Sequence, residues 1–192
     1  MKSVAVLGTG LLGEAIAQRC LSQGSSVHAW NRTKERIEPL LALGATEIGD
    51  LSEVSSTCET IITVLRDGAV TAKVVAGLGP LHHTTVIPMG TMGVSESKAL
   101  ATQVQRQNGF YLEAPVLGSK PQALNGSLLV MAGGETDVFE QQLDLLKHLS
   151  QQPQLVGPVG SGAATKIALN QLIASLTHSF SLSLRLIQHA GV

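Results

Sequence analysis

The feature that most constrains this chain is a glycine triplet directly after its first apolar run. Residues 3–7 (Ser-Val-Ala-Val-Leu) suit a buried strand, and Gly8, Gly10 and Gly13 follow at the spacing G-x-G-x-x-G. Apolar side chains then recur near helical spacing. A strand, a tight turn and a helix in this order are typical of dinucleotide-binding folds, in which the turn and the helix N-terminus receive a pyrophosphate. We therefore predict a bound dinucleotide here, in preference to an ordinary glycine-rich turn.

The composition limits the class of protein. A chain of 192 residues with 44% hydrophobic and 14% charged residues suits a sizeable, largely buried α/β domain. Its formal net charge of −1 provides no basic field for nucleic acid. No stretch of uncharged apolar residues is long enough to suggest a membrane span. The first predicted strand begins almost at once and leaves no room for a signal peptide, so we expect a cytoplasmic protein. Cys20 and Cys58 are not spaced as metal ligands or as a redox pair, so we expect both to be small core residues and we predict no metal site.

Strand-like and helix-like patterns alternate along the chain. We expect one helix over 33–43, closed by Gly44. The alternation predicts an α/β fold of the Rossmann type, a doubly wound and mostly parallel sheet over residues 1–161. Its ligand should lie beyond the carboxyl ends of the strands. Further strands are expected near 27–30, 46–48, 59–65, 84–87, 110–113, 128–132 and 155–157.

The last segment predicts one long helix. Residues 162–190 contain no acidic residue and no proline, and they would span roughly 40 Å at 1.5 Å per residue. Apolar side chains occupy more than one stripe, so we expect burial on several sides. The preceding domain can cover only part of this helix. We therefore expect the remaining stripe to pair with a second copy, giving a homodimer.

The turn after the second predicted strand bears on cofactor choice. In dinucleotide-binding folds this turn meets the adenosine ribose, and a free 2′-hydroxyl there favours a carboxylate. This chain has Asn31, Arg32 and Thr33 instead. The planar fork of Arg32 can hold a 2′-phosphate, so we predict NADP(H) in preference to NAD(H). A solvated surface arginine is the alternative. Thr33 is a candidate cap for the next helix.

Lys166 is a candidate proton donor. It lies near the start of the last predicted helix, where the helix dipole disfavours a cation, and Asn170 follows four residues later on the same face. This position predicts a lowered pKa, which would make proton transfer easier near neutral pH. The alternative is an ordinary surface lysine, and spacing alone does not decide between the two.

Three motifs in order carry a resemblance to a known family. The glycine turn at 8–13 is followed by E-A-P-V-x-G-S-K at 113–120 and by G-x-G-x-x-x-K-x-x-x-N at 160–170. This set resembles the β-hydroxyacid dehydrogenase family, which includes 3-hydroxyisobutyrate dehydrogenase, tartronate semialdehyde reductase and 6-phosphogluconate dehydrogenase. The turn at 31–33 and the form of the second motif are most similar to its NADPH-dependent glyoxylate/succinic semialdehyde reductase branch.

The resemblance implies a reductase that uses NADPH to reduce a small carboxylic aldehyde or keto acid, with Lys166 as the general acid/base. The loop from Val116 through Gly118 and Ser119 would hold the substrate carboxylate, largely through backbone N–H groups. The implied substrate-binding residues are Val116, Leu117, Gly118, Ser119 and Asn170. The implied cofactor-binding residues are Gly8, Thr9, Gly10, Leu11, Leu12, Gly13, Asn31, Arg32, Thr33, Leu65, Arg66, Met89 and Thr91.

The chain also departs from the family pattern. Leu117 stands where the family usually has serine, and Pro88 and Gly90 replace polar residues of a loop that usually reads D-M-S-T, so the pocket becomes less polar. Family members continue into an all-helical domain, of which 162–192 would be the first helix. Two alternatives remain: a non-catalytic NADP-binding module, and an imine reductase, which usually lacks lysine at position 166. The physiological substrate is left open.

Overall fold

The computed structural model describes residues 3–191, and residues 1, 2 and 192, at the outer ends of the two expected domains, lie outside this range. The strands are β1 (Ser3–Leu7), β2 (Ser26–Trp30), β3 (Thr46–Glu47), β4 (Thr60–Thr63), β5 (Thr85–Pro88), β6 (Phe110–Glu113), β7 (Val116–Leu117), β8 (Leu129–Gly134) and β9 (Gln154–Gly157). The helices are α1 (Leu11–Ser22), α2 (Glu38–Leu41), α3 (Val54–Thr57), α4 (Gly68–Ala76), α5 (Val94–Arg106), α6 (Lys120–Asn125), α7 (Thr136–Leu149) and α8 (Ser161–His189), with 3-10 turns η1 (Lys34–Ile37) and η2 (Leu51–Glu53).

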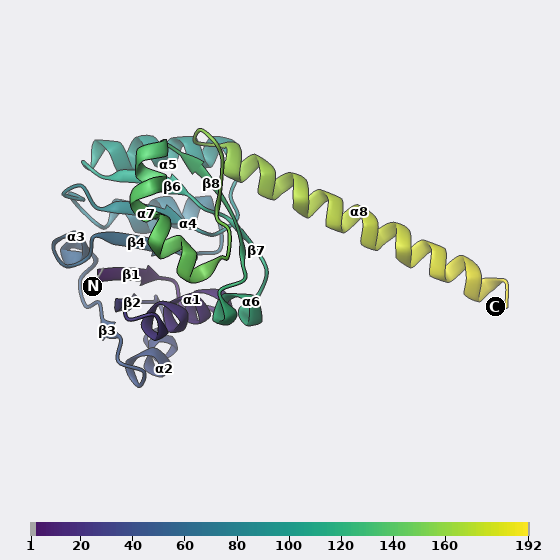
Figure 1. Ribbon diagram of the computed structural model, residues 1–192, viewed down its shortest axis with the longest axis horizontal. Coiled ribbons are helices and arrows are strands. Elements are labelled where there is room, and N and C mark those ends of the chain that lie inside the picture. The colour runs from purple at the N-terminus through teal and green to yellow at the C-terminus, as the bar shows by residue number, and fades with distance from the viewer. Residues whose placement is uncertain (1–2, 192) are drawn as a thin grey trace.

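One nine-stranded sheet organises the described residues, and it confirms the predicted α/β class (Figure 1). The strand order is β3-β2-β1-β4-β5-β6-β8-β7, with β9 also paired to β8. Pairings from β3 through β6 are parallel, whereas β8 runs antiparallel to β6 and β7. The sheet is therefore mostly parallel, with its antiparallel pairings on the β8 side.

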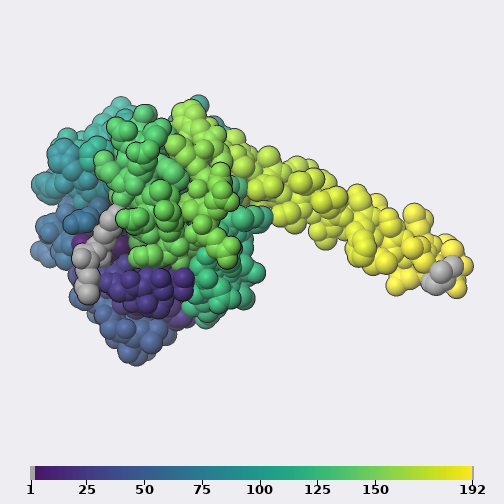
Figure 2. Space-filling view, viewed as in Figure 1, coloured from purple at the N-terminus to yellow at the C-terminus, as the bar shows by residue number. Residues whose placement is uncertain are grey.

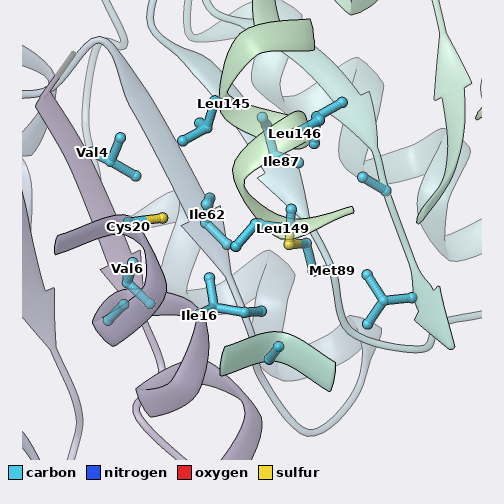
Figure 3. Close-up of a cluster of buried hydrophobic side chains, with 14 of the residues drawn as sticks. Val4, Val6, Ile16, Cys20, Ile62, Ile87, Met89, Leu145, Leu146 and Leu149 are labelled. Atoms are coloured by element: carbon cyan, nitrogen blue, oxygen red, sulfur yellow. The ribbon is translucent and has the colours of Figure 1, made fainter. Parts of the chain in front are cut away.

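The sheet is covered on both faces, as a parallel sheet requires. In β1, Val4 and Val6 belong to one core cluster, while Ala5 and Leu7 belong to the other. Figure 3 shows the first cluster, where side chains from the sheet, α1 and α7 point toward one another. Cys20 lies in this cluster and Cys58 in the second, which confirms both as core residues. Burial raises the pKa of the Cys20 thiol to about 12.

Two local expectations were wrong. The single helix expected over 33–43 is divided into η1 and α2. Pro39 lies in the first turn of α2, where its missing N–H is tolerated, so the regular helix begins only at Glu38. The stretch from Val116 to Ser119 is only partly a loop, because Val116 and Leu117 pair with β8 and Ser119 is the N-cap of α6.

Helix α8 extends away from the rest of the chain as a separate arm (Figures 1 and 2). Its buried residues are Gly162 and Ala163, both in the first turn, and from Asn170 to Gly191 every residue is exposed. Residues 3–191 of a single chain therefore bury only the first turn of this helix, and burial of the remainder by a second copy stays a prediction. Among the described helices, none is long and apolar enough to cross a membrane.

Candidate active site

The glycine turn joins β1 to α1 in a conformation that its glycines permit. Gly8 has a φ of +98°, and a Cβ there would collide with the carbonyl oxygen of Val64 at the end of β4. A Cβ on Gly13 would collide with the carbonyl of Gly8. The first turn of α1 therefore lies directly against the loop, as the spacing predicts.

Gly10 differs from its two neighbours because a Cβ there would meet nothing within 4 Å. It is the N-cap of α1, and no side chain caps this helix end. The first backbone N–H groups of α1 therefore face an open space, which suits an anion at the positive end of the helix dipole. This open cradle fits the diphosphate of a dinucleotide.

Thr9 and Asn31 join the glycine turn to the turn after β2. The Thr9 N–H donates to Asn31 Oδ1 at 3.1 Å, and the Thr9 hydroxyl donates to the carbonyl of Arg36 at 3.1 Å. Asn31 Nδ2 in turn donates to the carbonyl of Thr33 at 3.0 Å. Both side chains therefore hold the two loops together and leave the neighbouring Arg32 exposed. Thr33 is the N-cap of η1, as expected, but its side chain makes no capping hydrogen bond.

Leu65 lies between the glycine turn and the loop after β5. A Cβ on Gly8 would meet Leu65 Cδ2 at 2.8 Å, and a Cβ on Gly90 would meet the Leu65 carbonyl oxygen at 2.8 Å. Arg66 is exposed and pairs with Asp67, joined by an Nε–Oδ2 distance of 2.8 Å. Leu65 thus lies where the carboxyl ends of β1, β4 and β5 meet, at the place predicted for the cofactor.

Two predicted nicotinamide neighbours follow β5 and differ in exposure. Met89 is 2% exposed, and its side chain packs in the core cluster of Figure 3. Thr91 is exposed. Of these two side chains, Thr91 therefore has the greater access to a ligand.

The predicted substrate loop is partly engaged with the protein itself. Val116 is buried, Leu117 is half-buried and Gly118 is exposed with a φ of +128°. Gln122 Oε1 accepts hydrogen bonds from both the Ser119 N–H (3.0 Å) and the Ser119 hydroxyl (2.9 Å). These two Ser119 donors therefore hold the start of α6, and a carboxylate would have to compete with Gln122 for them.

Lys166 lies in the second turn of α8 and is half-buried. Burial lowers the pKa of its amine from the usual lysine value. Among the described residues, no hydrogen bond or ion pair engages this amine. Asn170, one turn further on, is exposed. These features suit an amine that takes up and releases protons.

In the sequence, Glu113 stands out only as the first residue of the motif at 113–120. The structure gives it a central position. Glu113 is 2% exposed at the end of β6, and its carboxylate accepts hydrogen bonds from N–H groups of Gly160 and Gly162 at the start of α8. The available signal was a carboxylate at the end of an otherwise apolar strand, although nothing in the sequence identifies its partners.

Other parts of the surface offer less chemistry. A hollow of about 300 Å³ lies at the amino ends of β1, β4 and β5, opposite the glycine turn. Within the described range, no group of three or more His, Cys, Asp or Glu side chains is arranged to hold a metal ion.

Comparison with known proteins places these features in context. The family described as the NAD binding domain of 6-phosphogluconate dehydrogenase matches residues 3–160. Glyoxylate/succinic semialdehyde reductase 2, chloroplastic, of Arabidopsis thaliana is 31% identical over 195 residues, covering 99% of this chain but 54% of the plant protein. The chain thus spans about half the length of this relative.

Solved structures show the same fold. Mycobacterium tuberculosis 3-hydroxyisobutyrate dehydrogenase, at 22% identity, matches with a TM-score of 0.87 over 97% of this chain and 66% of that one. An imine reductase from Pseudomonas sp. matches with a TM-score of 0.87 and 27% identity, over 93% of this chain and 63% of that one.

Proposed function

The chain belongs to the family of the NAD-binding domain of 6-phosphogluconate dehydrogenase, and from this premise we propose that it is the nucleotide-binding part of an NADPH-dependent reductase. Its substrate is a small carboxylic aldehyde or keto acid. Residues 1–161 form the nucleotide-binding domain, and 162–192 begin a helical domain. The open cradle at Gly10, against the uncapped start of α1, is the observation that carries this proposal.

Each part of the site has a separate task in this reaction. The first N–H groups of α1 bind the diphosphate, and the loop at 116–119 holds the substrate carboxylate. When bound, the nicotinamide supplies the hydride. Lys166, in its protonated form, donates its proton to the carbonyl oxygen as negative charge develops there. The lowered pKa of Lys166 supports this role because the proton is released more readily than from an ordinary lysine.

The preference for NADP(H) is part of the proposal. Arg32 is exposed next to Asn31, whose bonds to Thr9 and Thr33 fix the backbone of the turn. A guanidinium on this turn can bind a 2′-phosphate through two parallel hydrogen bonds. The likeness to the plant reductase supports glyoxylate or succinic semialdehyde as the class of substrate.

The Pseudomonas structure gives a second candidate function, the reduction of imines. Lys166 argues against it, because the resemblance implies that imine reductases usually lack a lysine at this position. The third possibility is a module that binds NADP(H) without catalysis, which the departure at Leu117 favours.

One experiment separates the three. NADPH oxidation by the purified chain is followed with glyoxylate, succinic semialdehyde and a cyclic imine, and NADPH binding is measured by fluorescence. We expect turnover with the aldehydes, and a loss of about 10²-fold or more in Lys166→Met with unchanged NADPH affinity. Lys73→Met, at an exposed position on α4, is the control. NADPH binding without any turnover would support the non-catalytic module, and turnover of the imine alone would support an imine reductase.

A further inference from the structure

The chemistry proposed above does not use the buried carboxylate of Glu113. Its Oε1 atom accepts hydrogen bonds from the backbone N–H groups of Gly160 at 2.8 Å, Gly162 at 2.7 Å and Ala163 at 3.3 Å. These donors lie at the N-terminus of α8, where N–H groups have no partner within the helix. Glu113 therefore satisfies several orphan donors at once and places an anion at the positive end of the helix dipole.

The second carboxylate oxygen is also engaged. Glu113 Oε2 accepts a hydrogen bond from the Ser97 hydroxyl on α5, and the Ser97 oxygen lies 2.7 Å from the Tyr111 hydroxyl on β6. Because Ser97 donates to Glu113, its oxygen accepts from Tyr111. Burial raises the pKa of Tyr111, which keeps the phenol protonated as a donor. The carboxylate is thus fixed from α5 and β6 on one side and from α8 on the other.

The backbone around this carboxylate leaves no spare room. A Cβ on Gly133 in β8 would collide with Glu113 Oε1, and a Cβ on Gly162 would meet the carbonyl oxygen of Met131 at 2.5 Å. The first turn of α8 therefore lies directly on β8. Lys166 follows Gly162 by four residues, so it lies one turn along the same helix face.

The base of α8 contacts β8, β9 and α5, and from Asn170 to Gly191 every residue of the arm is exposed. Its buried residues are Gly162 and Ala163, both bonded to Glu113, in a helix of 29 residues. Any displacement of this first turn is carried by the rigid helix to Lys166. The position of the amine therefore depends on a small set of bonds at the base of α8.

We propose that Glu113 is a positioning residue for Lys166: its buried carboxylate fixes the first turn of α8 on β8 and thereby sets where the Lys166 amine lies relative to the glycine turn. This proposal rests on the proton-donor role proposed above. The charged neighbours at this base are few. Lys98 on α5 approaches Gly160, and neither β8 nor β9 carries a charged side chain. Glu113 is therefore the anion that balances the helix start.

The test uses the full chain and needs no turnover. Backbone hydrogen exchange reports the first turn of α8, and competitive acylation followed by mass spectrometry reports the pKa of Lys166. In Glu113→Gln, which keeps the shape and removes the charge, we expect exchange at Gly162 and Ala163 to be about tenfold faster or more. The pKa of Lys166 should rise toward the usual lysine value as the amine becomes hydrated.

Two further variants make the result specific. Ser97→Ala removes the hydroxyl that bonds to both Glu113 Oε2 and Tyr111 but leaves the carboxylate in place, and it should give a smaller change in the same direction. Glu140→Gln makes the same chemical change at an exposed position on α7 and should leave both readouts unchanged. If Glu113→Gln does not fold, the exchange rates and the Lys166 pKa of Ser97→Ala are compared with those of the wild-type chain instead.

The outcomes separate this proposal from the reductase proposal. Unchanged exchange and an unchanged Lys166 pKa in a folded Glu113→Gln would overturn the positioning role, as would equal changes in Glu140→Gln. A wild-type chain that oxidises NADPH with none of the substrates counts against the reductase alone, because both readouts here are measured without substrate.

Discussion

The three glycines of the first turn differ in what surrounds them. Gly8 and Gly13 lie against backbone, whereas Gly10 borders open space. Gly10→Ala should therefore fold with a stability change below about 1 kcal/mol, since its φ of −69° suits alanine. The added methyl group would occupy the space of the diphosphate, so the Kd for NADPH should rise roughly tenfold or more, a loss of about 1.4 kcal/mol. Fluorescence titration measures the affinity and thermal unfolding the stability.

Gly49 provides the matched control for this substitution. A Cβ there also meets nothing within 4 Å, and it lies far along the chain from the glycine turn. Gly49→Ala should change neither NADPH affinity nor stability appreciably. Equal NADPH affinity in Gly10→Ala and the wild-type chain would contradict a diphosphate at this turn.

The lowered pKa of Lys166 predicts a pH dependence. Its cause is burial, which disfavours the charged amine. In the proposed reduction the protonated amine donates the proton, so kcat/KM should fall as pH rises through the Lys166 pKa, below the usual lysine value of about 10.4. In the oxidative direction the neutral amine is required, so the rate should rise through the same pKa. Initial rates over a pH series measure both, and a reductive rate that rises through this range would contradict the assignment.

Among the elements, α7 is tied to the sheet by a buried amide. Gln142 is 6% exposed; its Oε1 accepts from the Thr60 hydroxyl at 3.0 Å and its Nε2 donates to the Thr85 hydroxyl at 3.1 Å. Gln142→Leu leaves both hydroxyls without this partner, so we expect a loss of about 2 to 4 kcal/mol in the free energy of unfolding. Urea unfolding measures it.

The control for this prediction is Gln105→Leu, at an exposed position on α5. It should change the free energy of unfolding by less than about 0.5 kcal/mol. A Gln142→Leu chain as stable as this control would show that the two buried hydroxyls find other partners.

The elements also show which parts of the fold could be predicted from sequence. The glycine turn was predicted because β1, the turn and α1 follow one another in the sequence, although the turn also packs against Val64, just after β4. Helix α6 was missed although Ser119, Pro121 and Gln122 form the pattern of a helix start, with a capping box and proline in the first turn. The bonds of Glu113 to Gly160 and Gly162 join segments 47 and 49 residues apart, and no local pattern reports such a pairing.

At the scale of the whole molecule, the exposed apolar side of α8 is the feature that requires a partner. Leu176 is 61% exposed and Phe180 is 66% exposed, and their spacing of four places them on one helix face. Large apolar patches of this kind are rare on monomers. We propose that a second copy of the chain covers this face, so that wild-type protein sediments as a dimer at micromolar concentration.

Two pairs of substitutions on α8 test this pairing while holding the charge change constant. Leu176→Asp with Phe180→Asp places two carboxylates within the proposed interface, where their desolvation opposes association, so this variant should sediment as a monomer. Gln171→Asp with Ser181→Asp adds the same charge to the opposite face of the helix and should stay dimeric. Dissociation in both pairs would point to general repulsion or a frayed helix, and a wild-type monomer at high concentration would remove the homodimer altogether. Loss of the dimer in the first pair alone would show that α8 associates through its apolar face.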